Sequence, residues 1–251
     1  MTRRILVLGG TAEARALAAA LDADPAFAVV SSLAGRVRDP VLPAGDVRVG
    51  GFGGVDGLAA WLEEHRIDAV VDATHPFAAG ISANAVAAAH RRAVPLIILR
   101  RTAFEPRPGD RWVRVESLAN AADALHDLGE RAFLTIGRQG VSAFADNPQW
   151  FLIRAIDPPD PPLPRRHELL LRRGPFDLPT ERRLLAEHRI DVLVSKNSGG
   201  AATVAKLDAA REAELPVVMV ERPAPPAEVP TVATVAAVLE WLRLSPGSTV
   251  R

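Results

Sequence analysis

The 251-residue chain has no cysteine and no tyrosine, and lysine occurs only at Lys196 and Lys206. Without cysteine, disulfides, catalytic thiols, iron–sulfur clusters and thiolate zinc sites are all excluded. Without tyrosine, the chain also lacks the phenolic acid that many short-chain reductases use. Almost all of its positive charge is arginine, which a GC-rich genome explains, so a lysine placed in a loop such as Lys196 is the more notable.

Neither sign of charge is in excess, because 30 Lys and Arg residues balance 30 Asp and Glu residues. A balanced charge gives no field that would attract nucleic acid or an anionic membrane. The longest apolar runs, such as residues 93–99, are far shorter than a membrane span, and no signal-peptide region follows Met1. No spacing of histidines and carboxylates suggests a metal. We therefore expect a cytoplasmic protein with no metal, nucleic-acid or membrane partner.

The chain does contain a long internal repeat. The tetrapeptide His-Arg-Ile-Asp occurs at residues 65–68 and again at 188–191. Each copy continues into an apolar strand, a polar loop, an alanine-rich helix and a second apolar strand entered through proline, and the copies close on Arg101 and Arg222. Continuous apolar strands separated by helices are typical of parallel sheets covered on both faces. The sequence predicts an α/β fold with two parallel-sheet domains related by duplication, over residues 1–104 and 105–251.

The first strand, predicted over residues 4–8, runs into Gly9-Gly10-Thr11-Ala12-Glu13. A Rossmann-type fold places dinucleotide phosphates at this point, where glycines let the backbone approach and a helix offers its N-terminal N–H groups. The alternative is a tight turn in which Thr11 only caps the following helix. The motif lacks the full glycine pattern and therefore leaves both interpretations open.

The end of the second predicted strand favours a phosphorylated cofactor. A fold that binds NAD places an acidic residue about 20 positions after the glycines. Ser31 and Ser32 occupy that place here, and Arg36 follows. Hydroxyl and guanidinium donors suit a 2′-phosphate, which an aspartate would repel, so we expect NADPH. The alternative is an ordinary polar turn with a solvated arginine.

Two further loops of the first domain follow strands. The glycine loop at residues 50–54 either closes over the middle of the cofactor or is simply a flexible turn. In residues 72–78, His75 lies on a strand-end loop, where a histidine can exchange a proton near neutral pH. It could equally cap a helix that starts near Pro76. From the residues alone, we favour a place near the site over direct proton transfer for this side chain.

The matching loop of the second domain is Ser195-Lys196-Asn197-Ser198-Gly199-Gly200. Hydroxyl, amide and ammonium donors together with free backbone N–H groups would form an anion-binding corner. A polar cap with two glycines is the alternative, but such a cap would not need the lysine. Gly137-Arg138 follows another predicted strand and is a further candidate for binding a carboxylate-rich ligand.

Taken in order, these motifs resemble the precorrin-6A reductase family of the cobalamin pathway. The resemblance extends over residues 4–224 and rests on short segments at residues 9–13, 31–36, 50–54, 72–78, 135–138, 173–176 and 196–200. It implies NADPH-dependent reduction of one double bond of the precorrin-6A macrocycle, which gives precorrin-6B. It also implies two Rossmann-like domains that exchange a strand, with the macrocycle in a cleft between them. The implied partners are this tetrapyrrole and neighbouring enzymes of the pathway.

The resemblance and the motifs together give three groups of candidate residues. The candidate cofactor-binding residues are Gly9, Gly10, Thr11, Glu13, Ser31, Ser32, Arg36, Gly51, Gly53, Thr74, Pro76 and Phe77. The candidate substrate-binding residues are Arg101, Gly137, Arg138, Lys196, Asn197, Ser198, Gly199, Gly200 and Arg222. The candidate catalytic residue is His75. Either His75 or a water molecule would supply the proton that accompanies the hydride.

Two other functions are compatible with a chain of two α/β lobes. A cofactor-free tetrapyrrole enzyme would not need the phosphate corner at Gly9-Gly10. A non-catalytic module could close its two lobes on a small anion without turnover. Both alternatives predict that the chain does not bind NADPH.

Overall fold

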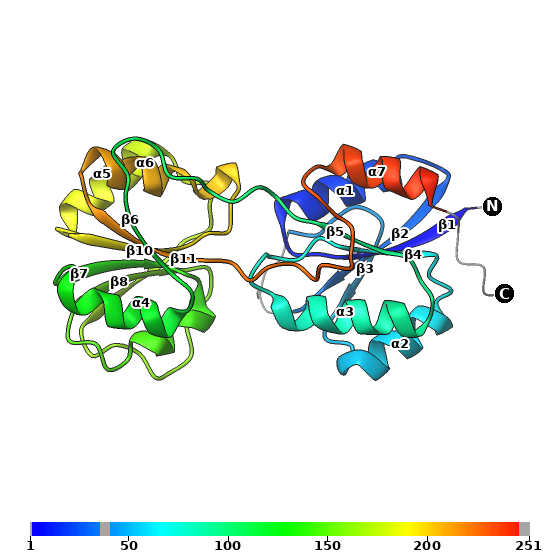
Figure 1. The fold of residues 1–251 in the computed structure, drawn as a ribbon, viewed down its shortest axis with the longest axis horizontal. Helices are drawn as coiled ribbons and strands as arrows, with labels where there is room; N and C mark the ends of the chain where they lie inside the picture. The colour runs from blue at the N-terminus through cyan, green and yellow to red at the C-terminus, as the bar shows by residue number, and fades with distance from the viewer. Residues whose placement is uncertain (1, 36–40, 246–251) are drawn as a thin grey trace. The chain divides into compact units, whose positions relative to one another are not determined.

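The computed structural model describes residues 2–35 and 41–245, which fold as two compact units (Figure 1). The first unit is Met1–Thr102 with Pro223–Arg251, and the second unit is Ala103–Arg222. Each unit has its own six-stranded sheet in which every strand pair is parallel. Among the described residues no helix is long and apolar enough to cross a membrane.

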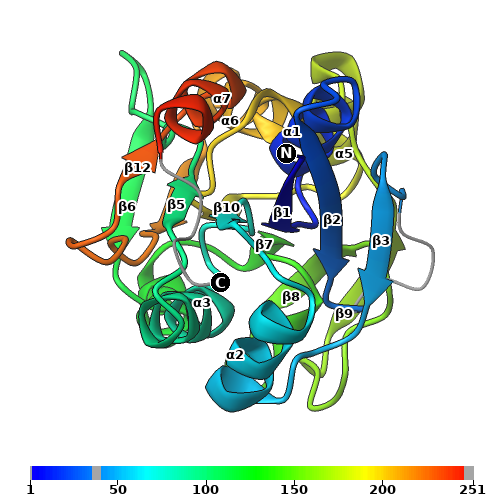
Figure 2. The same cartoon turned by 90° about the vertical axis from the view of Figure 1, so that its right-hand side faces the viewer.

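The sheet of the first unit is covered by helices on both faces. Its strands, in spatial order, are β12 (Thr231–Val232), β5 (Leu96–Leu99), β4 (Ala69–Asp72), β1 (Arg3–Leu8), β2 (Phe27–Leu33) and β3 (Asp46–Val49). Helices α1 (Ala12–Asp22) and α7 (Val235–Leu244) pack on one face, and α2 (Gly54–Glu64) and α3 (Ala79–Arg91) pack on the other (Figure 2). The central strands are apolar on both sides because both sides are buried.

The second unit repeats this plan. Its strands, in spatial order, are β6 (Arg111–Val115), β11 (Pro216–Val220), β10 (Val192–Lys196), β7 (Arg131–Thr135), β8 (Trp150–Ala155) and β9 (His167–Leu171). One face packs against α5 (Leu178–Glu187) and α6 (Ala205–Glu212). The other elements are α4 (Leu118–Ala124) and the 3₁₀ helices η1 (Leu125–Asp127), η2 (Arg138–Phe144) and η3 (Ala201–Thr203).

The edge strand beside each copy of the repeat comes from the other half of the chain. β6 follows β5 in sequence but pairs with β11, whereas β12 follows β11 but pairs with β5. The prediction of a second domain over residues 105–251, made together with a strand exchange between the domains, differs from the structure in that the segment from Pro223 onward belongs to the first unit. That segment belongs to the first unit because β12 pairs with β5 and because Val238 and Leu242 of α7 are fully buried in that unit's core.

The His-Arg-Ile-Asp repeat has a structural role in both units. Its arginines, Arg66 and Arg189, adopt left-handed backbone conformations with φ of 49° and 50°, which turn the chain after a helix. Its aspartates then bind the start of the neighbouring strand. Asp68 Oδ2 accepts a hydrogen bond from the Arg4 N–H at 2.7 Å, and Asp191 Oδ1 accepts one from the Arg131 N–H at 2.9 Å. The duplicated tetrapeptide thus connects a helix end to a strand start.

Several predicted element boundaries were displaced. The helix expected near Pro76 begins at Ala79, so the proline precedes the helix instead of occupying its first turn. In the second unit, the helix predicted from Ser117 ends at Ala124 and continues only as the 3₁₀ turn η1. The last helix, in contrast, spans Val235–Leu244 as predicted.

Candidate functional site

The carboxyl ends of the central strands of the first unit meet at one edge of its sheet. Leu8 of β1 pairs with Ser32 of β2 and with Asp72 of β4, and Asp72 pairs with Ile98 of β5. The loops that follow these strands carry most of the residues predicted to bind the cofactor. The parallel sheet therefore brings together loops that are far apart in the sequence.

The turn between β1 and α1 presents open backbone at the start of a helix. Gly10 has a φ of +111°, and a side chain added there would meet no atom within 4 Å, so the backbone is open to a ligand. Thr11 caps α1: its hydroxyl accepts from the Ala14 N–H at 3.1 Å and donates to the Ala73 carbonyl at 2.8 Å. The capping role is thus present, and it leaves the helix N-terminus beside an open glycine, where an anion is favoured.

Arg48 of β3 lies beside this turn, although we did not predict it as a site residue. Its guanidinium donates to the Ser32 hydroxyl at 3.0 Å and to the carbonyls of Gly50 and Gly51 at 2.9 and 3.1 Å. It also lies over the Phe52 ring, 3.8 Å from the ring centroid. Partial burial lowers the pKa of Arg48, although an arginine remains charged. Arg48 therefore holds a fixed positive charge next to Ser32.

The other residues predicted to bind this part of the cofactor or its middle lie in different surroundings. Ser31 is 1% exposed, and its hydroxyl has no hydrogen-bond partner among the described residues. Gly53 has a φ of 79° and precedes α2. Arg36 lies outside the described residues. Of the predicted set, Ser32 and Gly51 are the two that Arg48 contacts directly.

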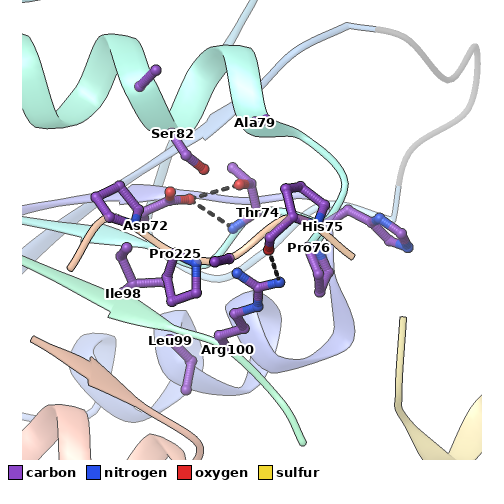
Figure 3. A pocket seen from close by; sticks show the side chains of 14 residues that line it. Asp72, Thr74, His75, Pro76, Ala79, Ser82, Ile98, Leu99, Arg100 and Pro225 are labelled. Atoms are coloured by element: carbon purple, nitrogen blue, oxygen red, sulfur yellow. Dashed lines mark hydrogen bonds between the residues drawn. The ribbon is translucent and has the colours of Figure 1, made fainter. Parts of the chain in front are cut away.

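The loop after β4 is organised around Asp72 (Figure 3). Asp72 Oδ1 accepts two hydrogen bonds from Thr74, one from its N–H at 3.0 Å and one from its hydroxyl at 2.6 Å. His75 is exposed, and its Nδ1 accepts from the Phe77 N–H at 3.3 Å. The histidine thus shapes the turn before α3 while its ring stays accessible.

A cavity of about 220 Å³ opens beside this loop. Its walls come from β4 and its loop, from α3, from the end of β5 and from the returning segment at residues 223–226. The Arg100 guanidinium donates to the Pro223 carbonyl and so fixes that segment as one wall. The cavity therefore lies wholly within the first unit.

Glu13 and Arg101 form an ion pair, although we predicted them to bind different ligands. Arg101 follows β5, and its guanidinium lies 3.0 Å from the Glu13 carboxylate in the first turn of α1. The pair therefore lies at the same sheet edge as the turn between β1 and α1. A ligand contact by either residue stays a prediction.

The second unit gathers its predicted residues in the same way. Ser195 of β10 pairs with Thr135 of β7, and Lys196 pairs with Val220 of β11, so the loops after these strands share one edge. These loops carry Gly137-Arg138, Lys196, Ser198, Gly199, Gly200 and Arg222. Partial burial lowers the pKa of Lys196, and an anionic ligand would offset that effect.

Asn197 differs from its neighbours because its side chain is already used inside the unit. It is 0% exposed, its Oδ1 accepts from the Phe104 N–H at 2.8 Å, and its Nδ2 donates to the Phe104 carbonyl at 3.2 Å and to Glu221. We therefore assign Asn197 to holding the segment around Phe104 against the end of β10. A contact of Asn197 with substrate stays a prediction.

A buried charged cluster lies in the core of the second unit. Arg154 of β8 forms an ion pair with the fully buried Glu181 of α5. The Arg154 guanidinium lies 3.8 Å from the Phe176 ring centroid and so holds the 173–176 segment against the sheet. Lys206 of α6 is buried close enough to Arg154 and Glu181 to feel their charges. Burial lowers the pKa of Lys206 to about 7, and the positive charge of Arg154 contributes to this decrease. An arginine within the apolar run 150–155 was the sequence signal for this cluster.

Comparison with known proteins identifies the family. The family model described as "Precorrin-6x reductase CbiJ/CobK" matches residues 4–243. The chain belongs to this family. It is 62% identical over 240 residues to the precorrin-6A reductase of Rhodococcus erythropolis, covering 95% of this chain and 97% of that relative. It is 52% identical over 241 residues to the precorrin-6A reductase of Mycobacterium tuberculosis, with the same coverage.

Structural comparison agrees with the sequence match. The chain resembles the solved structure of CobK precorrin-6A reductase with a TM-score of 0.89 and 46% identity, over 97% of this chain and 96% of the other. The predicted family and the predicted α/β fold class are thus confirmed, and the chain is an oxidoreductase of the CbiJ/CobK family. The cofactor-free enzyme and the non-catalytic module are set aside. The predicted ligand cleft stays a prediction.

Replacing Lys206 by methionine is expected to stabilise the protein at neutral pH. The pKa of Lys206 is about 7 in the folded chain and 10.5 ordinarily, so the unfolded state binds more protons between these values. The free energy of unfolding of the wild type should therefore rise with pH between these two values. The difference in unfolding free energy between Lys206→Met and wild type should shrink over the same range. Urea unfolding between about pH 6 and pH 10 measures this difference. Lys196→Met, which removes the half-buried lysine, is the control and should show a smaller pH dependence. An advantage of Lys206→Met that is independent of pH would contradict the burial argument.

Proposed function

We propose that this protein reduces one double bond of precorrin-6A with NADPH, giving precorrin-6B in cobalamin biosynthesis. The observation that carries the proposal is the match to the reductase family over residues 4–243. The two relatives described above are named for precorrin-6A and not for a cobalt-containing precorrin, which favours the cobalt-free substrate. The open turn between β1 and α1 and the positive charge of Arg48 next to Ser32 support the cofactor site that the proposal requires.

The residues of the first unit fit NADPH. Gly9, Gly10 and Thr11 would receive the pyrophosphate at the start of α1, and the loop with Gly51 and Gly53 would lie along the cofactor. Ser32 and Arg48 would hold the 2′-phosphate by charge-assisted hydrogen bonds, with Ser31 and Arg36 as the further predicted donors. When bound, NADPH supplies the hydride.

The residues of the second unit fit a polyanionic macrocycle. Precorrin-6A carries several acetate and propionate groups, which require cationic and N–H donors. Lys196 and Arg138 would bind carboxylates, supported by Gly137, Ser198, Gly199, Gly200 and Arg222. Arg101 of the first unit is a further donor, although it must share its charge with Glu13. Asn197 contributes indirectly by fixing the base of the loop.

His75 is the residue that would supply the proton. Its ring is exposed on the loop beside the cavity, where the Phe77 N–H donates to Nδ1. A histidine can donate a proton near neutral pH. The remaining task of the site is alignment, with reacting atoms held ~3–3.5 Å apart.

The activity itself is tested with purified protein, precorrin-6A and either NADPH or NADH. We expect NADPH to be consumed in proportion to the macrocycle, and mass spectrometry should show the product heavier by two hydrogens. NADH should support a much lower kcat/KM because it lacks the 2′-phosphate. Absence of any turnover with NADPH and freshly prepared substrate would refute the proposed function.

Replacing Arg48 by alanine should weaken NADPH binding about tenfold or more, because a charge-assisted hydrogen bond is lost. NADH affinity should change little. Titration with 2′,5′-ADP and with 5′-ADP separates the phosphate contact from loosening of the loop around Phe52. Arg91→Ala, which removes an exposed arginine on α3, is the matched control. Equal loss for 2′,5′-ADP and 5′-ADP would remove Arg48 from the phosphate site.

Replacing His75 by alanine should slow single-turnover reduction by about 100-fold or more if His75 donates the proton. NADPH affinity, measured separately, should stay within a few-fold of wild type. His126→Ala is the control, since that histidine lies in η1 of the second unit. An unchanged single-turnover rate would assign the proton to water.

A further inference from the structure

The buried charges of the second unit are gathered in one place. Among the described residues of that unit, the buried charged side chains are Arg154, Glu181 and Lys206, which are 7%, 0% and 5% exposed. Arg154 forms an ion pair with Glu181, and the charges of both act on the pKa of Lys206. They come from β8, α5 and α6, so the cluster lies between the sheet and the two helices that cover this face.

The stability of the fold does not by itself explain this cluster. Glu181 Oε2 is buried and has no hydrogen-bond partner among the described residues. When Lys206 is protonated, the cluster contains two cations and one carboxylate. Replacing a buried ion pair by apolar residues of similar volume is often neutral or stabilising. The residues that the cluster contacts outside the core therefore indicate another role.

The cluster reaches the edge of the sheet through Phe176. Arg154 is the last residue but one of β8, and its guanidinium lies 3.8 Å from the Phe176 ring centroid and 4.8 Å from that of Phe133. Phe133 is a core residue, whereas Phe176 belongs to the segment 173–176, which connects β9 to α5. A guanidinium over a ring is attracted to it, and more strongly where water is excluded. Arg154 therefore holds this connecting segment from below.

The segment 173–176 in turn lies against the loop that follows β10. A Cβ atom added to Gly174 would lie 3.5 Å from the Ala202 carbonyl oxygen, so the two backbones pack closely. Ala202 belongs to η3, which directly follows Gly200, the last residue of the loop predicted to bind anions. The segment also carries the exposed Arg173, a cation at the same edge of the sheet. It therefore links the buried cluster to that loop.

We propose that Arg154, held by Glu181, is a positioning residue for substrate binding, because it fixes the segment 173–176 through the Phe176 ring as a support for the loop at 196–200. The inference rests on the proposed function, in which that loop binds carboxylates of the macrocycle. A loop that is fixed before binding loses less conformational entropy when the ligand arrives. In this role Arg154 touches neither substrate nor cofactor.

The test compares three variants of the full chain. Phe176→Leu removes the ring and leaves the buried ion pair intact. Phe176→Trp keeps a ring for the guanidinium and is the conservative variant. Arg154→Met/Glu181→Leu replaces the whole ion pair by apolar side chains, so that neither member is left without its partner. Steady-state kinetics with precorrin-6A, titration with NADPH and urea unfolding are measured for each variant.

The KM for precorrin-6A should rise about tenfold in Phe176→Leu and in Arg154→Met/Glu181→Leu, because both lose the contact that fixes the segment. The kcat should stay within a few-fold of wild type, since the chemical step is untouched. NADPH affinity should not change, because its proposed site is in the first unit. Phe176→Trp should restore the wild-type KM. Combining Phe176→Leu with Arg154→Met/Glu181→Leu should raise KM no further, because both act on one contact.

Arg182→Met/Glu212→Leu is the matched control, because it replaces an exposed ion pair that also joins α5 to α6. It should keep the wild-type KM. The positioning inference is overturned, while the proposed function stands, if folded Phe176→Leu keeps the wild-type KM, if Phe176→Trp does not restore it, or if the control raises KM as much. If wild type does not reduce precorrin-6A at all, both are overturned.

Discussion

Parallel pairing brings the carboxyl ends of neighbouring strands to one edge of a sheet, and both units depend on this geometry. Their central strands are buried on both faces, so polar side chains are placed mainly beyond the strand ends. In the first unit this rule brings Gly10, Ser32 and Asp72 to one edge, and in the second unit it does the same for Gly137 and Lys196. The same duplicated α/β architecture therefore places a set of polar residues at one edge of each sheet.

A few buried or partly buried charged groups are held in place by neighbouring residues. Arg48 is held by carbonyls and an aromatic ring, Asp72 by Thr74, and Arg154 by Glu181 and Phe176. Each of these charges is fixed in position before a ligand arrives, which lowers the entropic cost of binding. Asn197, in contrast, makes its hydrogen bonds inside the second unit and holds the segment around Phe104.

The sequence predicted most of the architecture because apolar strands, proline entries and the Thr11 cap are local signals. It could not predict Arg48, since an arginine in a short alternating strand has the pattern of any solvated arginine until the fold brings it to Ser32. The pairing of β12 could not be predicted from its own residues, because a two-residue strand carries no information about its partner; only the family resemblance implied an exchanged strand. Arg154 was within reach, as a charge in an apolar run implies a buried partner.

The exchanged edge strands impose an order on synthesis. A ribosome completes every strand of the second sheet before Thr231–Val232 and α7 leave the exit tunnel. Until then, the nascent first sheet keeps an unpaired edge at β5, and the apolar face later covered by Val238 and Leu242 stays in contact with water. The amino-terminal unit is therefore translated first but closes last, and chaperones would meet it in that open state.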